Sequence, residues 1–156
     1  MLVTTGASDL IIDAASNNQC QTVDSDTGLC VGGVFDPRAS SSFQQIAASP
    51  ALNITYADGT SATGPLVEDT IAIGNVNISN VQFGLVQQGT DTSGFSTGVM
   101  GIGYSASESI GTRYPNIPEV LVAAGAINSR LYSLYLNDAS EYLEAPPAKH
   151  EDNDIE

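Results

Sequence analysis

Three short stretches hold residues that could take part in catalysis. Val3–Leu10 reads Val-Thr-Thr-Gly-Ala-Ser-Asp-Leu, with Thr4 directly after an apolar pair and just before a turn-forming glycine. Threonine serves as a nucleophile when it is the first residue of a chain. That role would require removal of Met1–Val3, for which the sequence offers no support. The other two stretches are Asp26-Thr27-Gly28 and the residues around His150.

Neither of these two stretches predicts a reactive site. Asp26-Thr27-Gly28 follows the polar pair Asp24-Ser25, so its aspartate does not stand at the end of an apolar strand. His150 has three acidic residues close behind it, a composition that could bind a metal ion. Nothing there would fix a coordination geometry, because the surrounding residues show little periodicity. We therefore expect no metal site and no cofactor.

Cys20 and Cys30 are the only cysteines, and both lie in a polar segment. Pairing them would close a short loop and contribute about 3 kcal/mol by the chain-entropy estimate. A disulfide would indicate an oxidising compartment. The tripeptides Asn53-Ile54-Thr55 and Asn77-Ile78-Ser79 match the glycosylation sequon and point to the same compartment.

Composition excludes several classes of partner. The 156 residues contain 4 basic and 18 acidic side chains, for a formal net charge of −14. This field repels phosphates, so we expect neither nucleic acid nor an anionic membrane as a partner. The charge suits either a soluble acidic surface or an acidic working medium. No apolar run approaches the roughly 20 residues of a membrane helix, and no signal-peptide pattern follows Met1.

Turn residues and apolar patterns predict the elements that position these residues. The predicted strands are Val3–Ile12 with a turn at Thr5-Gly6-Ala7, Leu52–Tyr56, Leu66–Ile73, Val76–Val86, Gly98–Gly103 and Leu131–Leu136. Asp58-Gly59 is a strong hairpin signal after the second of them. One helix should begin after Asn116, because Glu119 completes a capping box, and it should end at Gly125.

Four of these stretches, in order, resemble the first lobe of the pepsin-like aspartic proteases. They are Val3–Leu10, Gly33–Phe43, the Asn53–Gly64 hairpin and Thr97–Tyr104. Their sequences are most similar to the fungal, yapsin-like secreted members. The resemblance implies a mostly β fold, an incomplete N-terminal lobe with one short helix that lacks its first hairpin. We expect this lobe over residues 1–138 and an acidic disordered tail over residues 139–156.

The resemblance also implies that the reactive residue is missing. Thr4 occupies the position of the catalytic aspartate, while Thr5 and Gly6 retain the loop; Ala7 replaces a serine and Ile11 a tryptophan. In this family two carboxylates share one proton, and the ionised one activates a water molecule. A threonine hydroxyl cannot accept that proton. We expect an aspartic endopeptidase family protein that is inactive as this chain, which also lacks the sequence of a second lobe.

The hairpin carries the other residues that the resemblance singles out. Tyr56, Asp58, Gly59 and Thr60 match the flap that closes over bound peptide in the family. We expect no cleft beneath the flap in this chain alone, so peptide contact is expected only in a two-lobed parent. Asp9 is expected to be a solvated turn residue.

Three alternatives to proteolysis remain open. The chain could bind peptides without cleaving them, as a pseudopeptidase, or could present its apolar lobe face to a partner protein. It could also be a truncated product without function, with unpaired strand edges that aggregate. By resemblance, we expect a peptide or protein substrate for a two-lobed parent, and secretion or a cell-surface location.

Overall fold

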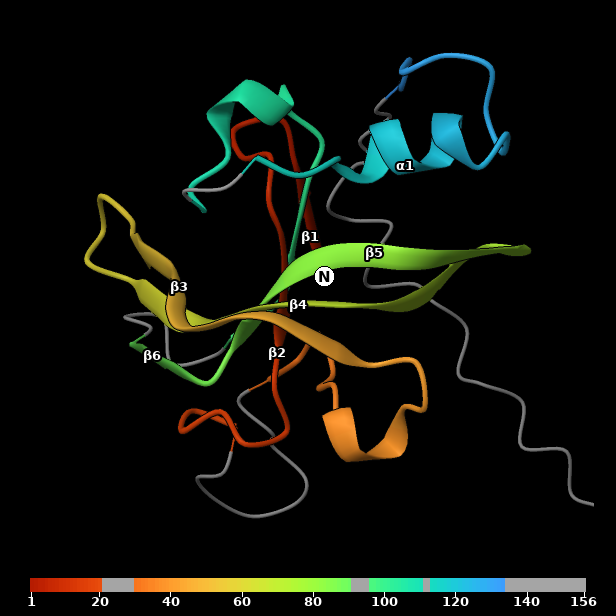
Figure 1. Ribbon diagram of the computed structural model, residues 1–156. Helices are drawn as coiled ribbons and strands as arrows, with labels where there is room; N and C mark the ends of the chain where they lie inside the picture. Colours follow the sequence, from red (N-terminus) through yellow and green to blue (C-terminus); the bar gives the residue numbers. More distant parts are fainter. Residues whose placement is uncertain (21–29, 91–95, 111–112, 134–156) are drawn as a thin grey trace, which may run out of the picture.

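Strands dominate the computed structural model, which describes residues 1–20, 30–90, 96–110 and 113–133 (Figure 1). The strands are β1 (Leu2–Thr4), β2 (Leu10–Asp13), β3 (Gln44–Thr55), β4 (Ser61–Ile73), β5 (Val76–Val86), β6 (Gln88–Thr90) and β7 (Val99–Gly101). Two 3-10 turns, η1 (Pro37–Ala39) and η2 (Ser105–Ser107), and the helix α1 (Ile117–Ala123) complete the regular structure of these residues. The predicted mostly β fold with one short helix is confirmed.

The strand β7 lies between β1 and β2, although β1 and β2 are consecutive in the chain. It pairs in parallel with β1 and antiparallel with β2. The loop between β1 and β2 must therefore cross the end of β7. Gly101 permits this crossing, because a Cβ atom there would lie 2.5 Å from the carbonyl carbon of Ser8. The amide of Gly101 donates to the carbonyl of Asp9 at 2.9 Å and ties the crossing together.

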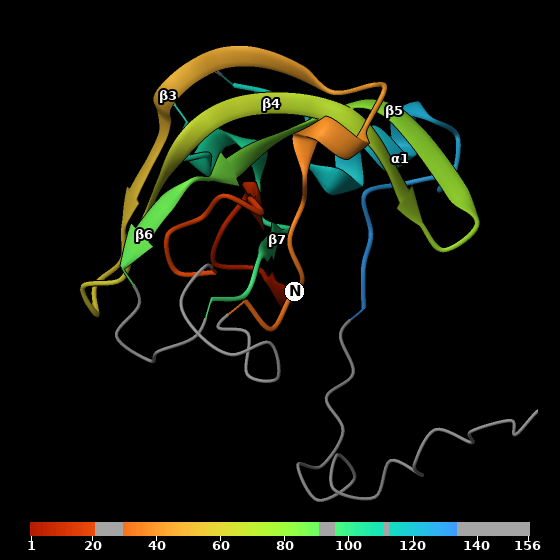
Figure 2. The same ribbon diagram turned by 90° about the horizontal axis from the view of Figure 1, so that it is seen from below.

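The longest strands, β3, β4 and β5, form an antiparallel meander that arches over the amino-terminal strands and β7 (Figure 2). The short strand β6 pairs with the beginning of β4. One end of the arch is the β3–β4 hairpin, and the other is the β4–β5 hairpin. β2 joins the arch by pairing in parallel with the last residues of β5. The arch and the crossing strands are thus parts of one sheet.

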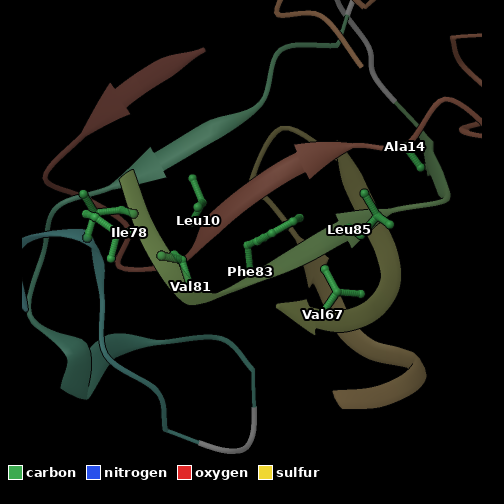
Figure 3. Packing of buried hydrophobic residues seen from close by; sticks show 8 residues of the cluster. Leu10, Ala14, Val67, Ile78, Val81, Phe83 and Leu85 are labelled. Atoms are coloured by element: carbon green, nitrogen blue, oxygen red, sulfur yellow. The ribbon is translucent and has the colours of Figure 1, made fainter. Parts of the chain in front are cut away.

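Two clusters of buried apolar side chains form the core. Phe83 lies in the first cluster, with Leu10, Val81, Leu85 and Val67 around it (Figure 3). The second cluster contains Leu52, Leu66 and Ile11, and the side chain of Leu52 is 0% exposed. Leu10 and Ile11 both lie on β2, and they belong to the first and the second cluster, respectively. Both clusters therefore pack the arch against β2.

The helix α1 begins and ends where the sequence predicts. The side chain of Asn116 accepts from the amide of Glu119 at 3.1 Å, and Glu119 accepts from the amide of Asn116 at 3.4 Å. Gly125 has a φ of +70° and donates to Val122, while Ala126 donates to Leu121. These two bonds form a Schellman ending.

Several strand predictions differ from the structure. β4 begins at Ser61, before the predicted start at Leu66, and β6 was not predicted. β3 begins at Gln44, well before the predicted start at Leu52, because pairing with β4 continues through exposed residues that show no apolar alternation. Leu131–Leu136 was expected as a strand, but Leu131–Ser133 form none and are exposed. The remaining residues of that stretch, the predicted lobe boundary at Asp138 and the tail 139–156 lie outside the described residues.

Replacing Leu52 with alanine should lower the free energy of unfolding by about 2–5 kcal/mol, because it opens a cavity in the second cluster. Urea denaturation followed by circular dichroism measures this loss. Leu131→Ala is the matched control, since Leu131 is 84% exposed and its loss should change stability by less than about 0.5 kcal/mol. Equal effects of the two substitutions would contradict the assignment of the core.

Candidate functional site

Thr4 is the last residue of β1 and directly precedes the loop between β1 and β2. Backbone hydrogen bonds from the segment after β7 hold this loop in place. The Oγ1 atom of Thr4 accepts a hydrogen bond from the amide of Gly6 at 3.1 Å. The carbonyl of Thr4 accepts from Ile102, and the carbonyl of Ala7 accepts from Gly103, both at 2.9 Å. The backbone therefore fixes the position of Thr4, and its hydroxyl contributes one bond within the loop.

Two buried side chains support the loop from behind. Ser8 donates its hydroxyl to the carbonyl of Tyr104. Asp9 is 1% exposed, and its carboxylate accepts from the Tyr114 hydroxyl at 2.9 Å and from the Ser109 amide at 2.8 Å. The expectation that Asp9 is a solvated turn residue is therefore wrong. Its partners lie about a hundred residues away in the sequence, and no local pattern reveals them.

The charge of Asp9 affects its neighbours. Burial, reinforced by that negative charge, raises the pKa of Tyr114 well above its ordinary value, so this phenol stays a hydrogen-bond donor. Glu108 accepts from the Tyr114 amide at 3.0 Å through Oε2, whereas its buried Oε1 has no hydrogen-bond partner among the described residues. Burial raises the pKa of Glu108, and the hydrogen bond from the Tyr114 amide opposes this. The charges of Asp9 and Glu119 raise the pKa further, and Arg113 lowers it slightly.

The β3–β4 hairpin forms the predicted turn. Tyr56 donates its amide to the Thr60 carbonyl at 2.8 Å, and Gly59, with a φ of +88°, donates to the Tyr56 carbonyl at 3.0 Å. The carboxylate of Asp58 accepts from the Thr60 amide at 2.9 Å and closes the turn. Burial, and then the charges of Asp9 and Asp58, raise the pKa of Tyr56. The influence of Asp9 on Tyr56 agrees with a hairpin that leans over the loop.

A cavity of about 460 Å³ lies between this hairpin and the loop. Its walls include Thr4, Gly6 and Ala7 from the loop, Tyr56, Asp58 and Thr60 from the hairpin, and Ile11, Val86 and Val99 from the strands. The expectation that this chain alone has no cleft beneath the hairpin is therefore wrong. Residues of the arch and of the crossing strands line the space, which is open on one side, and both are present in the chain.

A second carboxylate of the cavity wall was not singled out in the sequence. Asp13 is 2% exposed and accepts hydrogen bonds from Ser96, at 2.9 and 3.0 Å, and from Asn17 at 2.9 Å. The sulfur atoms of Cys20 and Cys30 lie near it. They form the expected disulfide with each other, so this group offers no thiolates to a metal ion.

Asn53 and Asn77 do not line the cavity. Asn53 on β3 and Asn77 on β5 are exposed. Asp26-Thr27-Gly28 and His150 lie outside the described residues. None of the helices in the described ranges is long and apolar enough to cross a membrane.

A second hollow, of about 580 Å³, lies beside the first turn of α1. Tyr104 and Tyr132 line it, and they are 87% and 48% exposed. Arg130 forms an ion pair with Glu119 at 2.7 Å on its wall. Tyr104 and Tyr132 thus form an exposed aromatic surface beside α1.

Comparison with known proteins gives consistent results. The family model for eukaryotic aspartyl protease matches residues 1–144. The chain is 40% identical over 143 residues to the probable aspartic-type endopeptidase opsB of Aspergillus fumigatus, covering 88% of this chain and 28% of that protein. It is 37% identical over 142 residues to secreted aspartic protease 8 of Candida albicans, covering 90% of this chain and 33% of the relative. The chain therefore spans about a third or less of these relatives.

A similar fold occurs in the crystal structure of the aspartic proteinase from Irpex lacteus. The TM-score is 0.57 at 18% sequence identity, and the match covers 83% of this chain and 33% of that one. At this identity the likeness concerns the fold alone.

Glu108 should make the protein less stable as the pH rises. Its raised pKa means that the folded state keeps a proton at pH values where the unfolded chain, with an ordinary value of 4.5, has released it. The resulting stability is complete below that value and is lost as the pH rises through the folded-state pKa. Between about pH 4 and pH 7, the Tm of Glu108→Gln should therefore fall less than the Tm of the wild type. Thermal denaturation measures both values.

Glu68→Gln is the control for that experiment, because it also removes one acidic group but leaves Glu108 in place. It should keep the pH dependence of the wild type. An unchanged dependence in Glu108→Gln would show that Glu108 does not contribute to it.

Proposed function

Because the chain belongs to the eukaryotic aspartyl protease family, we propose that it is a first lobe that binds extended peptide beneath its hairpin and does not cleave it. The observation that carries this proposal is the cavity whose wall contains both Thr4 and Tyr56. The family reaction is hydrolysis of a peptide bond. We propose that this chain binds peptide as the family does and does not hydrolyse it.

The absence of catalysis follows from the chemistry of Thr4. Hydrolysis needs a carboxylate that is ionised at the working pH and takes a proton from water, beside a second carboxyl that donates one. A threonine hydroxyl does not ionise there, and the hydroxyl of Thr4 already accepts from Gly6. Ala7 and Ile11, which also depart from the family pattern, add no acid or base to the cavity wall.

Peptide binding is supported by the walls of the cavity. Peptide and ligand sites are concave and mostly apolar, with a few polar groups that fix orientation. Here Ile11, Val86 and Val99 supply apolar surface, and Thr60 and Asp58 supply polar groups. We assign Tyr56, Asp58, Gly59 and Thr60 to the flap that contacts the peptide. In a two-lobed parent, the same lobe would contact one side of a peptide or protein substrate.

A location outside the cell is part of the proposal. The Cys20–Cys30 disulfide is of a kind that persists in oxidising compartments, and one relative is named as a secreted protease. We therefore propose secretion or attachment to the cell surface. The net charge of −14 agrees with a peptide partner rather than a nucleic acid.

A second candidate function is a protein contact through the aromatic surface beside α1. Tyr104 and Tyr132 are exposed there, at 87% and 48%. Exposed apolar patches of this type are common at protein interfaces. A stable hetero-complex in solution that is lost in Tyr104→Ser, with peptide binding unchanged, would favour this candidate.

Binding of a fluorescein-labelled statine-type peptide, followed by fluorescence anisotropy, tests the main proposal. We expect saturable binding that Tyr56→Ala weakens by about 1–2 kcal/mol, roughly 5–30-fold, because the tyrosine wall of the cavity is lost. Tyr132→Ala is the matched control, since it removes a similarly exposed tyrosine from the other hollow. No saturable binding, or equal loss in both variants, would overturn the proposal.

The substitution Thr4→Asp tests whether an aspartate at position 4 is enough for peptide cleavage by this chain. We expect Thr4→Asp to leave the chain without measurable cleavage of a quenched fluorescent peptide at acidic pH. The reaction needs two carboxylates that share a proton, and the described residues supply one loop of this kind. Thr4→Ser serves as the control for substitution in the loop. Cleavage by Thr4→Asp that pepstatin inhibits would refute the need for a second loop carboxylate.

A further inference from the structure

The outer surface of the arch carries an exposed asparagine near each of its ends. Asn53 lies on β3, next to the fully buried Leu52, and Asn77 lies on β5, next to the buried Ile78. Since side chains alternate along a strand, each asparagine points away from the core that its neighbour enters. The arch of Figure 2 therefore has its apolar side chains on the inside and both asparagines on the outside.

Both asparagines belong to complete acceptor tripeptides. Thr55 follows Asn53 by two positions on the same strand, and the alternation places both side chains on one face. Ser79 is also exposed, beside the irregularity that Asn80 introduces with its φ of +58°. Neither asparagine amide makes a side-chain hydrogen bond within the described residues. Each side chain is thus open to a modifying enzyme and to the bulk of an attached sugar.

Each of the two asparagines lies on a strand edge that has no strand neighbour among the described residues. Within the described ranges, β3 pairs with β4 alone and lies at the edge of the sheet. β5 pairs with β2 only over Gly84–Val86, so its residues around Asn77 have β4 as their one strand neighbour in the described part of the chain. Exposed edges of this kind can pair with another chain and start aggregation. A bulky, solubilising group at each edge would block that pairing.

We propose that Asn53 and Asn77 carry N-linked glycans, and that these glycans protect the two unpaired edges of the arch. In the transfer, the amide nitrogen forms a bond to the anomeric carbon of an oligosaccharide as the bond from that carbon to a lipid pyrophosphate breaks. The amide loses one proton, and the lipid pyrophosphate leaves. Neither asparagine lines the cavity or the second hollow, so both surfaces stay accessible.

Intact mass tests the modification. The 156-residue chain is secreted from a eukaryotic host behind a cleavable leader and weighed before and after treatment with peptide-N-glycosidase. We expect two glycans on the wild type and one on each of Asn53→Gln, Asn77→Gln and Thr55→Ala. Thr55→Ser keeps the tripeptide and should keep both glycans. Asn75→Gln, in the same hairpin as Asn77 but outside any acceptor tripeptide, is the matched control and should also keep both.

Sedimentation velocity tests the protective role on the same samples. Enzymatic removal of the glycans from the folded protein should increase its self-association, and Asn53→Gln/Asn77→Gln should behave like the deglycosylated wild type. Secreted wild type without glycans, or glycans that persist in the double variant, would overturn the assignment of the sites. Equal self-association of the glycosylated and the deglycosylated protein would overturn the role of the glycans at the edges.

Discussion

β7 passes so close beneath the β1–β2 loop that a Cβ atom on Gly101 would lie 2.5 Å from the backbone of Ser8. Most features of the site depend on this close passage. It fixes the carbonyl of Thr4 on Ile102 and that of Ala7 on Gly103, and it brings Ser8 within reach of Tyr104. The loop therefore has a defined shape that does not depend on which side chain stands at position 4.

Under the proposed function, this independence lets the peptide-binding surface keep its shape without an acid–base group at position 4. The supports of the loop are backbone bonds and the buried side chains of Ser8 and Asp9, none of which needs a carboxylate at Thr4. Exchange of an aspartate for a threonine at that position removes a charge and retains an acceptor for the Gly6 amide. The exchange leaves the backbone supports of the loop in place, and a threonine hydroxyl does not supply the acid–base group that hydrolysis needs. Binding and catalysis are separable for this physical reason.

The sequence predicts the local parts of this fold and misses the distant ones. The Asn116–Glu119 capping box, the Asp58-Gly59 turn and the Cys20–Cys30 disulfide follow from neighbouring residues, and the structure contains all three. The burial of Asp9 and Asp13 depends on Tyr114 and Ser96, which lie 105 and 83 residues away. No residue close to either aspartate indicates that contact. The cavity was missed because its walls come from both the arch and the loop.

The chemistry of the buried acids bears on the medium in which the lobe works. Asp9 and Asp13 have hydroxyl and amide donors as partners, and Glu108 keeps one buried oxygen without any donor among the described residues. Burial raises the pKa of Glu108, so this carboxyl is less costly to bury when it is protonated. The net charge of −14 acts in the same direction, because acid lowers the repulsion among the surface carboxylates. Glu108 and the net charge therefore favour an acidic medium. Asp69 acts in the opposite direction, because its burial raises its pKa but hydrogen bonds from Ser42, Ser40 and Thr70 together bring it below the ordinary value.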